Sequence, residues 1–418
     1  MILQWLVEMK TDEMEKNNTL INLPVDVLEM IMKRLPLKDC LRLRAICRSC
    51  RKTISNVIEN KHCCHLPELP LVSLPSKNSV FFYSLSTKSV LPLRTPLWKN
   101  TDKCVGSVEG WLIVSDYSEK GFAKVFFLNP AIDVRIMIPS KLYFPSNSPV
   151  PGNRISHVNK LVASSKPNCD GSDCYLVGLL GDFCHIVIYK PFDKSWTIVE
   201  QEKDSGTFFT DVEIIGTKLY ANDLSSYSIL VYDLKDSTNG PPKAEVLVGL
   251  PKRRPSELSI ILNSVLMFLA KDEALRELYL IYMHCSNTEH ETQHAVSDRF
   301  KITLAFAKPP RVTGFEVFKL VTNKDDIEWQ NVKLEDRAVF VSNYKSMIIS
   351  RDELNCNKEL IKANSIYFAL TCCCPTNPWS GLEFGMFSFT DSSIEYFSVD
   401  TLKHGDVPYP LWFVPSLW

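Results

Sequence analysis

The segment from residue 23 to residue 58 constrains the fold more than any other, because start and stop signals of short helices follow one another closely there. Asn22 is a suitable N-cap, and Pro24 stands at the first helical position, where its missing N–H costs no hydrogen bond. Pro36 ends this first helix. The apolar spacing beyond Pro36 predicts two further short helices.

These helices are too small a unit to bury their apolar side chains internally. Val27, Leu28, Ile31 and Leu35 recur at helical spacing and form one apolar stripe. Units of this size usually need a partner or a neighbouring domain. We therefore expect the stripe to dock onto helices of another protein. The alternative is an ordinary helical hairpin that belongs to a larger α domain.

Four motifs follow one another in this segment, and they read Leu-Pro, Arg-Leu-Pro, Leu-Lys-Asp-Cys-Leu-Arg-Leu-Arg and Ile-Cys-Arg-Ser-Cys-Arg. Their order resembles an F-box. F-box helices bind the Skp-type adaptor of cullin-RING ubiquitin ligases. The family usually has Trp where this chain has Cys50, and the lost volume is expected to weaken adaptor binding. The resemblance implies docking through Leu23, Pro24, Leu28, Ile31, Leu35, Pro36, Leu41 and Leu43.

Composition and charge exclude several classes of protein. The chain has 418 residues, enough for two or three domains, and a net charge of −1, so no strong basic field points to a nucleic-acid partner. The basic stretch 37–52 is interpreted as a solvated helix face, with a phosphate-binding patch as the alternative. The apolar start, residues 1–7, is too short for a signal peptide or a membrane span. We expect a cytoplasmic or nuclear protein without a membrane partner.

The 14 cysteines predict neither disulfides nor a metal site. Without a secretory signal they are expected to be reduced thiols. Cys47 and Cys50 form a C-x-x-C motif, but no second pair stands at zinc-like spacing. The run from His62 to His65 is consecutive, which suits a single tetrahedral site poorly. We therefore predict no metal and no cofactor.

Beyond the prolines of residues 61–77, helical spacing gives way to short runs rich in Val, Ile, Phe and Tyr. The runs share one unit, an apolar strand, a turn with Asn, Asp or Lys, and a second strand, as in KVFFLNPAIDVRIMI and HIVIYKPFDKSWTIV. Such units recur about every 40 to 50 residues, the period of propeller blades. We predict a mainly β protein in which a three-helix F-box precedes a six- or seven-bladed kelch-like β-propeller.

The predicted boundaries are 1–19 for a flexible N-terminal segment, 20–60 for the F-box, 61–77 for a linker and 78–418 for the propeller. The predicted strands are 80–85, 89–93, 110–115, 123–128, 134–138, 174–180, 185–189, 196–199, 211–215, 218–221, 228–232, 244–248, 258–262, 265–270, 278–283, 315–320, 328–333, 339–341, 365–370, 385–389 and 394–398.

Three short motifs extend the resemblance to nearly the whole chain. Gly-Trp-Leu, Phe-Leu-Asn-Pro and the C-terminal Trp-Phe-Val-Pro-Ser-Leu-Trp are similar to plant F-box proteins of the KIB type. The C-terminal region of that family is kelch-like, in agreement with the repeats.

Candidate catalytic residues do not form a recognisable constellation. There is no P-loop, H-E-x-x-H or G-x-S-x-G motif. Asp325 and Asp326 are interpreted as turn residues, and His157, His185 and His290 have no assignable partner. We therefore predict no catalytic residue.

Aromatic residues and long loops are the candidates for target binding. Tryptophans near strand ends are interpreted as blade-core residues, with recognition anchors as the alternative. The loops 144–153, 284–298 and 372–381 are expected to line a partner surface. The tryptophans concerned are Trp111, Trp196, Trp329 and Trp379.

The combined pattern predicts a non-catalytic, substrate-recognition subunit of a Skp–cullin–F-box ubiquitin ligase. The F-box would attach to the Skp-type adaptor and, through it, to a cullin-RING module, while the propeller would bind a target protein whose identity the sequence does not specify. One alternative is a propeller enzyme of a sugar-active or lactone-hydrolysing type, which requires carboxylates or metal ligands in its central channel. A second is a scaffold protein that works without the adaptor.

Overall fold

Strands dominate the described part of the chain, which also contains helix α2 (Val25–Met32). The computed structural model describes residues 25–32, 69–75, 79–91, 98–132, 134–145, 157–167, 174–181, 185–199, 207–235, 241–251, 265–285, 311–322, 326–350, 361–371, 382–397 and 410–415.

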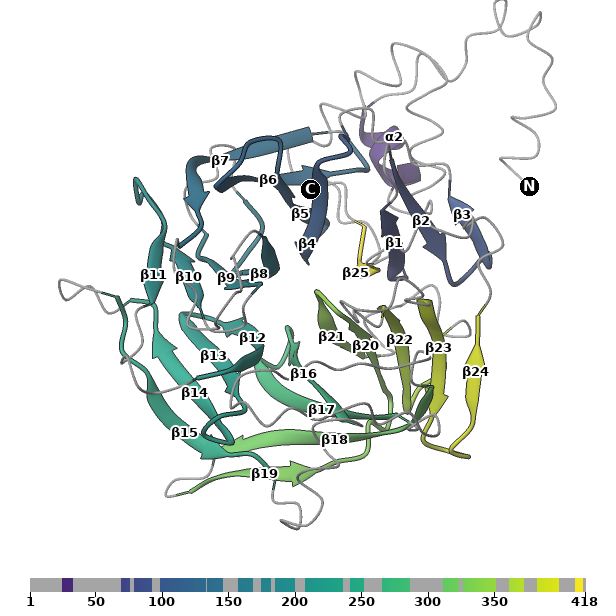
Figure 1. Cartoon of the computed structure of the whole chain (residues 1–418). Coiled ribbons are helices and arrows are strands. Elements are labelled where there is room, and N and C mark those ends of the chain that lie inside the picture. Colours follow the sequence, from purple (N-terminus) through teal and green to yellow (C-terminus); the bar gives the residue numbers. More distant parts are fainter. Residues whose placement is uncertain are drawn as a thin grey trace, which may run out of the picture.

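The strands form sheets arranged as a ring of blades (Figure 1). There are four sheets of four strands and one sheet of nine strands within the described residues. The nine-stranded sheet divides where β16 and β21 share just two parallel residue pairs, Lys271 with Met347 and Asp272 with Ile348. The described strands therefore make six blades, and the predicted β-propeller is confirmed.

Blade 1 combines strands from both ends of the chain, and blades 2 and 3 are built from consecutive strands. Blade 1 contains β1 (Leu71–Pro75), β2 (Val80–Ser84), β3 (Ser89–Leu91) and β25 (Leu411–Phe413). Blade 2 contains β4 (Asp102–Val108), β5 (Trp111–Asp116), β6 (Phe122–Asn129) and β7 (Val134–Tyr143). Blade 3 contains β8 (Val158–Ala163), β9 (Leu176–Leu180), β10 (Ile186–Tyr189) and β11 (Thr197–Val199).

The other three blades complete the ring. Blade 4 contains β12 (Phe209–Ile215), β13 (Lys218–Asp223), β14 (Ser228–Asp233) and β15 (Glu245–Gly249). Blade 5 contains β16 (Val265–Asp272), β17 (Glu277–Cys285), β18 (Val312–Thr322) and β19 (Ile327–Asn331). Blade 6 contains β20 (Arg337–Ser342), β21 (Ser346–Ser350), β22 (Ser365–Thr371), β23 (Leu382–Ser388) and β24 (Ile394–Tyr396).

Burial changes from the centre of the ring to its rim. β4, β8, β12 and β16 lie at the centre, and β7, β11, β15 and β19 lie at the rim (Figure 1). Every residue of β5 and β9 is buried, whereas β15 and β19 are exposed or half-buried throughout. A strand that is covered on both faces reads as a continuous apolar run, which explains why the sequence predicts the middle strands well.

The predictions omitted β1, β4, β8, β21 and β25. β4 reads DKCVGSV and β8 reads VNKLVA, so polar residues interrupt both runs. These strands line the channel, where a polar side chain can find a partner on the next blade. The predicted strands near 315–341 were assigned to one repeat. In the structure they belong to two blades, because β18 and β19 complete blade 5 and β20 begins blade 6. The predicted strand 258–262 lies outside the described residues.

The predicted linker 61–77 contains a strand of the propeller. β1 pairs with β2 from Leu71 with Ser84 to Pro75 with Val80, and with β25 at Leu71 with Phe413. The prolines around it were expected to disfavour long helices and central strands. Pro75 is instead the last residue of β1, a position that costs few ladder hydrogen bonds. The propeller therefore begins before residue 78.

A second proline was also misjudged. Pro139 was expected to end a strand at Ile138, but β7 continues to Tyr143. β7 is the outer strand of its sheet, and its register with β6 shifts between Lys124 and Phe126. Pro139 is thus placed at a bulge, where a missing N–H is tolerated.

The C-terminal strand closes the ring. β25 is hydrogen-bonded to β1, and Ser107 of blade 2 donates its hydroxyl to the carbonyl of Trp412 at 2.8 Å. The indole N–H of Trp412 donates to the carbonyl of Val341 in blade 6 at 2.8 Å. The last described strand thus completes blade 1 and contacts blades 2 and 6 on either side, which closes the ring.

Candidate functional site

Helix α2 carries exposed apolar side chains on the described part of the F-box segment. Val27 is 38% exposed and Met30 is 57% exposed, while Ile31 is half-buried. Val27, Met30 and Ile31 are three and four residues apart and so share one face of the helix. Met30 was not among the predicted docking residues, although its spacing from Val27 indicates it.

Most predicted docking positions cannot be placed on this helix face. Leu28 and Ile31 both belong to α2. Those outside the described residues are Leu23, Pro24, Leu35, Pro36, Leu41 and Leu43.

A group of buried charges lies where the inner strands of several blades meet. Lys160 of β8 contacts Asp211 of β12, with Nζ 2.5 Å from Oδ1, and both side chains are buried. The backbone N–H groups of Val212 and Leu269 also donate to the Asp211 carboxylate, each at 2.8 Å. Asp211 therefore connects blades 3, 4 and 5.

Glu213, two residues further along β12, links blades 5 and 6. Its oxygens lie 3.8 Å from Nζ of Lys271 and 3.9 Å from Nζ of Lys345. Lys271 also pairs with the exposed Glu273 at 2.7 Å. The Oε2 atom of Glu213 accepts no hydrogen bond within the described residues. The lysine ammonium groups therefore stabilise the negative charge of Glu213 mainly by electrostatic attraction at 3.8 and 3.9 Å.

Burial and neighbouring charges set the protonation of this group. Burial raises the pKa of Asp211 even though Lys160 opposes the effect. Burial alone would also raise the pKa of Glu213. The positive charges of Lys345, Lys271 and Lys160 outweigh this effect and hold the pKa of Glu213 below its usual range. Burial lowers the pKa of Lys345. The attraction of these groups joins consecutive blades around the channel.

The channel carboxylates bear on the alternative of a propeller enzyme. That alternative requires carboxylates or metal ligands that converge in the channel, and Asp211 and Glu213 of β12 are both engaged by lysines. Among the described residues, no three His, Cys, Asp or Glu side chains are placed to hold a metal ion. Cys104, Cys174 and Cys285 form no disulfide bond within the described residues. Within the same residues, no helix has the length and apolar character to cross a membrane.

Several other predicted candidates have structural roles. Trp111 is buried in the core of blade 2, and Trp329 is half-buried on β19. The carboxylate of Asp326 accepts the N–H of Ile327 at 2.9 Å, as expected of a turn residue. The ring of His157 packs directly on Gly181, where a Cβ atom would lie within 2.8 Å of three ring atoms.

The structure describes the predicted binding loops and the remaining candidate residues only in part. The predicted binding loops 144–153 and 284–298 are described at residues 144–145 and 284–285, and the loop 372–381 lies outside the described residues, as do Trp379, His290 and Asp325.

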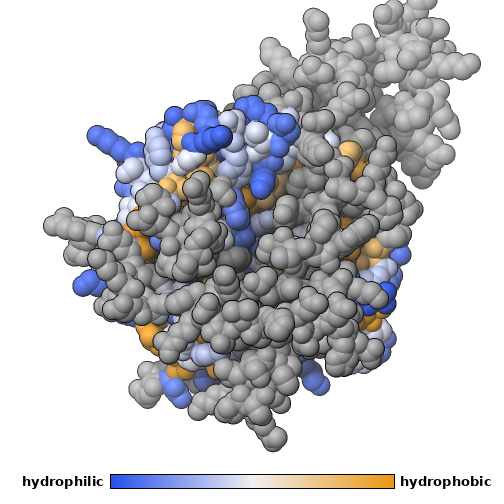
Figure 2. Space-filling view, in the orientation of Figure 1, coloured by the Kyte–Doolittle hydropathy of each residue, from blue (hydrophilic) through white to orange (hydrophobic). Residues whose placement is uncertain are grey.

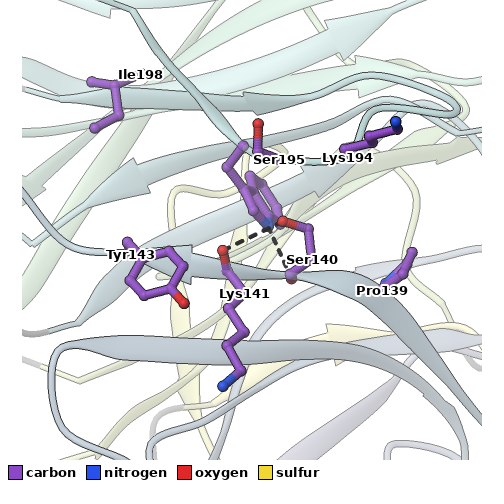
Figure 3. A pocket seen from close by; sticks show the side chains of 8 residues that line it. Pro139, Ser140, Lys141, Tyr143, Lys194, Ser195 and Ile198 are labelled. Atoms are coloured by element: carbon purple, nitrogen blue, oxygen red, sulfur yellow. Dashed lines mark hydrogen bonds between the residues drawn. The ribbon is translucent and has the colours of Figure 1, made fainter.

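Trp196 lines a pocket of about 400 Å³ between blades 2 and 3 (Figure 3). Its indole N–H donates to the carbonyl of Ser140 at 3.4 Å, which joins the turn before β11 to β7. Trp196 was predicted as a blade-core residue with target recognition as the alternative, whereas no residue of β7 was predicted to bind a target. The lining residues are Pro139, Ser140, Lys141, Tyr143, Lys194, Ser195, Trp196 and Ile198.

Comparison with known proteins gives two family matches. The model of the KIB1-4 β-propeller matches residues 82–395, and that of the F-box domain matches residues 20–62. An F-box protein of Arabidopsis thaliana is 31% identical over 118 residues, which make up 28% of this chain and 30% of that protein. The chain thus aligns with under a third of this relative.

Solved structures share the propeller architecture only distantly. A putative 6-phosphogluconolactonase from Bacteroides uniformis is 12% identical, with a TM-score of 0.36 over 82% of this chain and 99% of that chain. The Cps50 (Swd1) β-propeller domain of Myceliophteria thermophila is 10% identical, with a TM-score of 0.33 over 79% of this chain and 93% of that chain. Neither likeness carries an inference about function.

An F-box segment followed by a ring of β-sheets defines an F-box protein with a β-propeller. Because the propeller model matches most of its length, the chain belongs to the KIB1-4 β-propeller family. The predicted resemblance to KIB-type F-box proteins is therefore confirmed.

Proposed function

We propose that this chain is the substrate-recognition subunit of a Skp–cullin–F-box ubiquitin ligase. The F-box docks onto the Skp-type adaptor, and the propeller binds a target protein. The observation that carries the proposal is the presence, in one chain, of an F-box at 20–62 and a KIB1-4 propeller at 82–395. The exposed apolar side chains of Val27 and Met30 support it, because a helix that docks on a partner keeps apolar surface uncovered.

In this function the chain performs no bond chemistry of its own. It holds a target lysine close to the ubiquitin-conjugating enzyme, which raises the effective concentration of the two reactants. The lysines that engage Asp211 and Glu213 support a structural role for the channel carboxylates. We place the protein in the cytoplasm or nucleus, where its cysteines would remain reduced.

Co-purification of the full chain with a Skp-type adaptor tests the proposal. The wild-type chain should capture the adaptor, and the Leu28→Asp/Ile31→Asp variant should lose it, because carboxylates at an apolar interface would be buried without partners. Val246→Asp/Leu266→Asp is the matched control. It places two carboxylates at exposed apolar positions of the propeller, which are 70% and 40% exposed, and should retain the adaptor.

The result depends on equal folding of both variants, which circular dichroism checks. Adaptor captured equally by the wild type and the F-box variant would contradict docking through α2. Failure of the wild-type chain to capture any Skp-type adaptor would contradict the ligase function itself.

A further inference from the structure

The pocket between blades 2 and 3 is built by an irregularity in β7. The register of β6 and β7 pairs Lys124 with Lys141 and then Phe126 with Met137. Three residues of β7 therefore stand opposite Val125 alone, and this bulge contains Pro139 and Ser140. Bulges re-aim side chains and are common beside functional sites. Here the bulge turns the Ser140 carbonyl toward Trp196, its hydrogen-bond donor.

The wall of the pocket is apolar and fixed in place. Trp196 packs on the buried ring of Tyr189, with ring centroids 5.3 Å apart. Trp196 and Ile198 also pack on the core that blades 2 and 3 share. Tyr143 also lines the pocket and is 63% exposed. A rigid, partly exposed indole of this kind is the usual anchor for an apolar side chain of a partner.

Positive charge predominates around the pocket. Lys141 and Lys194 line it, with no carboxylate among the lining residues, and their side chains extend to different sides of it in Figure 3. Lys124 pairs with Glu119 at 2.5 Å, and Glu119 also lies 3.9 Å from Lys141.

The nearby carboxylates do not neutralise this charge. Asp193 caps the backbone N–H of Lys190 at 3.2 Å. Four lysines, Lys124, Lys141, Lys190 and Lys194, thus lie on this side of the ring with three carboxylates, Asp116, Glu119 and Asp193. In Figure 2 hydrophilic residues with hydrophobic ones between them cover the corner of the ring that β6 and β7 occupy.

The sheet edges beside the pocket favour an extended occupant. β7 and β11 are each the outer strand of their sheet, so within the described residues each has one edge without a strand partner. An extended peptide can add its backbone to such an edge and place alternate side chains in neighbouring pockets. β11 has three residues, so a peptide would gain little from the backbone alone. The side chains of the peptide would therefore have to supply the specificity.

We propose that this pocket binds an extended segment of the target protein in which an Asp or Glu lies within a few residues of a bulky apolar side chain. The apolar side chain packs on Trp196, and the carboxylate pairs with Lys194 on one side of the pocket or with Lys141 on the other. No arginine lines the pocket, so the two lysines would act as point charges on the bound carboxylate and not as bidentate donors. Arg135 of the same blade is engaged with Asp102 at 3.5 Å. The inference rests on the proposed function as a substrate receptor.

A peptide-display selection on the full chain, captured with its Skp-type adaptor, tests this inference. Random 12-residue peptides are selected on the wild type and on Lys141→Glu/Lys194→Glu in parallel. We expect the wild type to enrich peptides with an acidic and a bulky apolar residue, and the variant to bind these peptides on the order of tenfold more weakly. Lys218→Glu/Lys243→Glu, which reverses two exposed lysines of blade 4, should bind them like the wild type.

The indole is tested by Trp196→Phe, which keeps an aromatic ring but removes the bond to Ser140, and by Trp196→Ala, which removes the ring. Binding of the selected peptides should be strongest in the wild type, weaker in Trp196→Phe and weakest in Trp196→Ala, while adaptor capture stays constant. Adaptor capture without any acidic and apolar consensus would overturn the pocket inference and leave the ligase function standing. Loss of adaptor capture in the wild type would overturn the ligase function instead.

Two other occupants give different results in the same samples. If the pocket is an interface between copies of this chain, sedimentation will show a wild-type dimer that Lys141→Glu/Lys194→Glu converts to a monomer. If it is a general anion site, labelled dT₂₀ will bind as tightly as the selected peptides. Either outcome would overturn the proposal of an acidic peptide.

Discussion

Trp412 packs edge-on against Phe340, with ring centroids 5.0 Å apart and ring planes at 75°. The two rings come from the last strand of the chain and from the inner part of blade 6. Both are fully buried, and the indole N–H of Trp412 also donates to Val341. This contact therefore links ring closure to the aromatic core of blade 6.

Trp412→Ala should lower the free energy of unfolding by about 3–5 kcal/mol, because it leaves a large cavity at the closing strand. Trp412→Phe should lower it less, since it keeps a ring and loses mainly the hydrogen bond. Urea unfolding monitored by circular dichroism measures both changes. Tyr143→Ala, at a residue that is 63% exposed, serves as the control. A loss below about 1 kcal/mol in Trp412→Ala would show that β25 does not hold the ring closed.

Gly106→Ala tests the close approach of blades 2 and 3. A Cβ at Gly106 would lie 1.9 Å from the backbone oxygen of Leu161, and a backbone atom cannot move aside cheaply. We expect destabilisation of about 3 kcal/mol, at the upper end of overpacking. Gly314→Ala is the matched control, because nothing lies within 4 Å of its Cβ position. Thermal unfolding compares the two variants, and equal midpoints would contradict the predicted clash.

The fold could be predicted from sequence where strands are covered on both faces or pair in tight hairpins. The predicted strands 218–221 and 228–232 correspond to β13 and β14, which pair from Lys218 with Asp233 to Asp223 with Ser228. The inner strands β4 and β8 were missed because polar residues such as Lys160 break the apolar pattern, whereas the inner strands β12 and β16 were predicted. β1 and β25 were missed because their pairing joins Leu71 to Phe413 across nearly the whole chain.

The candidate sites depend on contacts that sequence patterns do not contain. Lys160 and Asp211 are 51 residues apart, and they meet because blades 3 and 4 are neighbours. The pocket needs a bulge in β7 beside Trp196, and neither spacing nor composition indicates that bulge. The motif order of the F-box, in contrast, is local, so the sequence predicted its class but not the exposure of Met30.

Cys50→Trp should strengthen binding of the Skp-type adaptor. Cys50 lies outside the described residues, and the prediction follows from the tryptophan that F-box sequences usually have there. Filling the missing volume should raise adaptor affinity by about tenfold, equivalent to ~1.4 kcal/mol. Biolayer interferometry with the full chain measures this affinity. Cys47→Trp, in the same segment, should not improve it, and an equal effect of both variants would contradict a specific role for position 50.

Lys160→Met should make stability depend on pH through Asp211. Burial already raises the pKa of Asp211, and loss of the lysine raises it further. The folded variant then retains a proton that the unfolded chain releases above about pH 4, so its stability falls as the pH rises from about 4 to 7. At pH 7 we expect a loss of about 3–5 kcal/mol relative to the wild type, and a smaller loss near pH 4.5. Urea unfolding at both pH values measures the difference. Lys160→Met/Asp211→Asn lacks the carboxylate and should regain most of the stability without this pH dependence, whereas a loss in Lys160→Met that is equal at both pH values would show that the ionised Asp211 is not its cause.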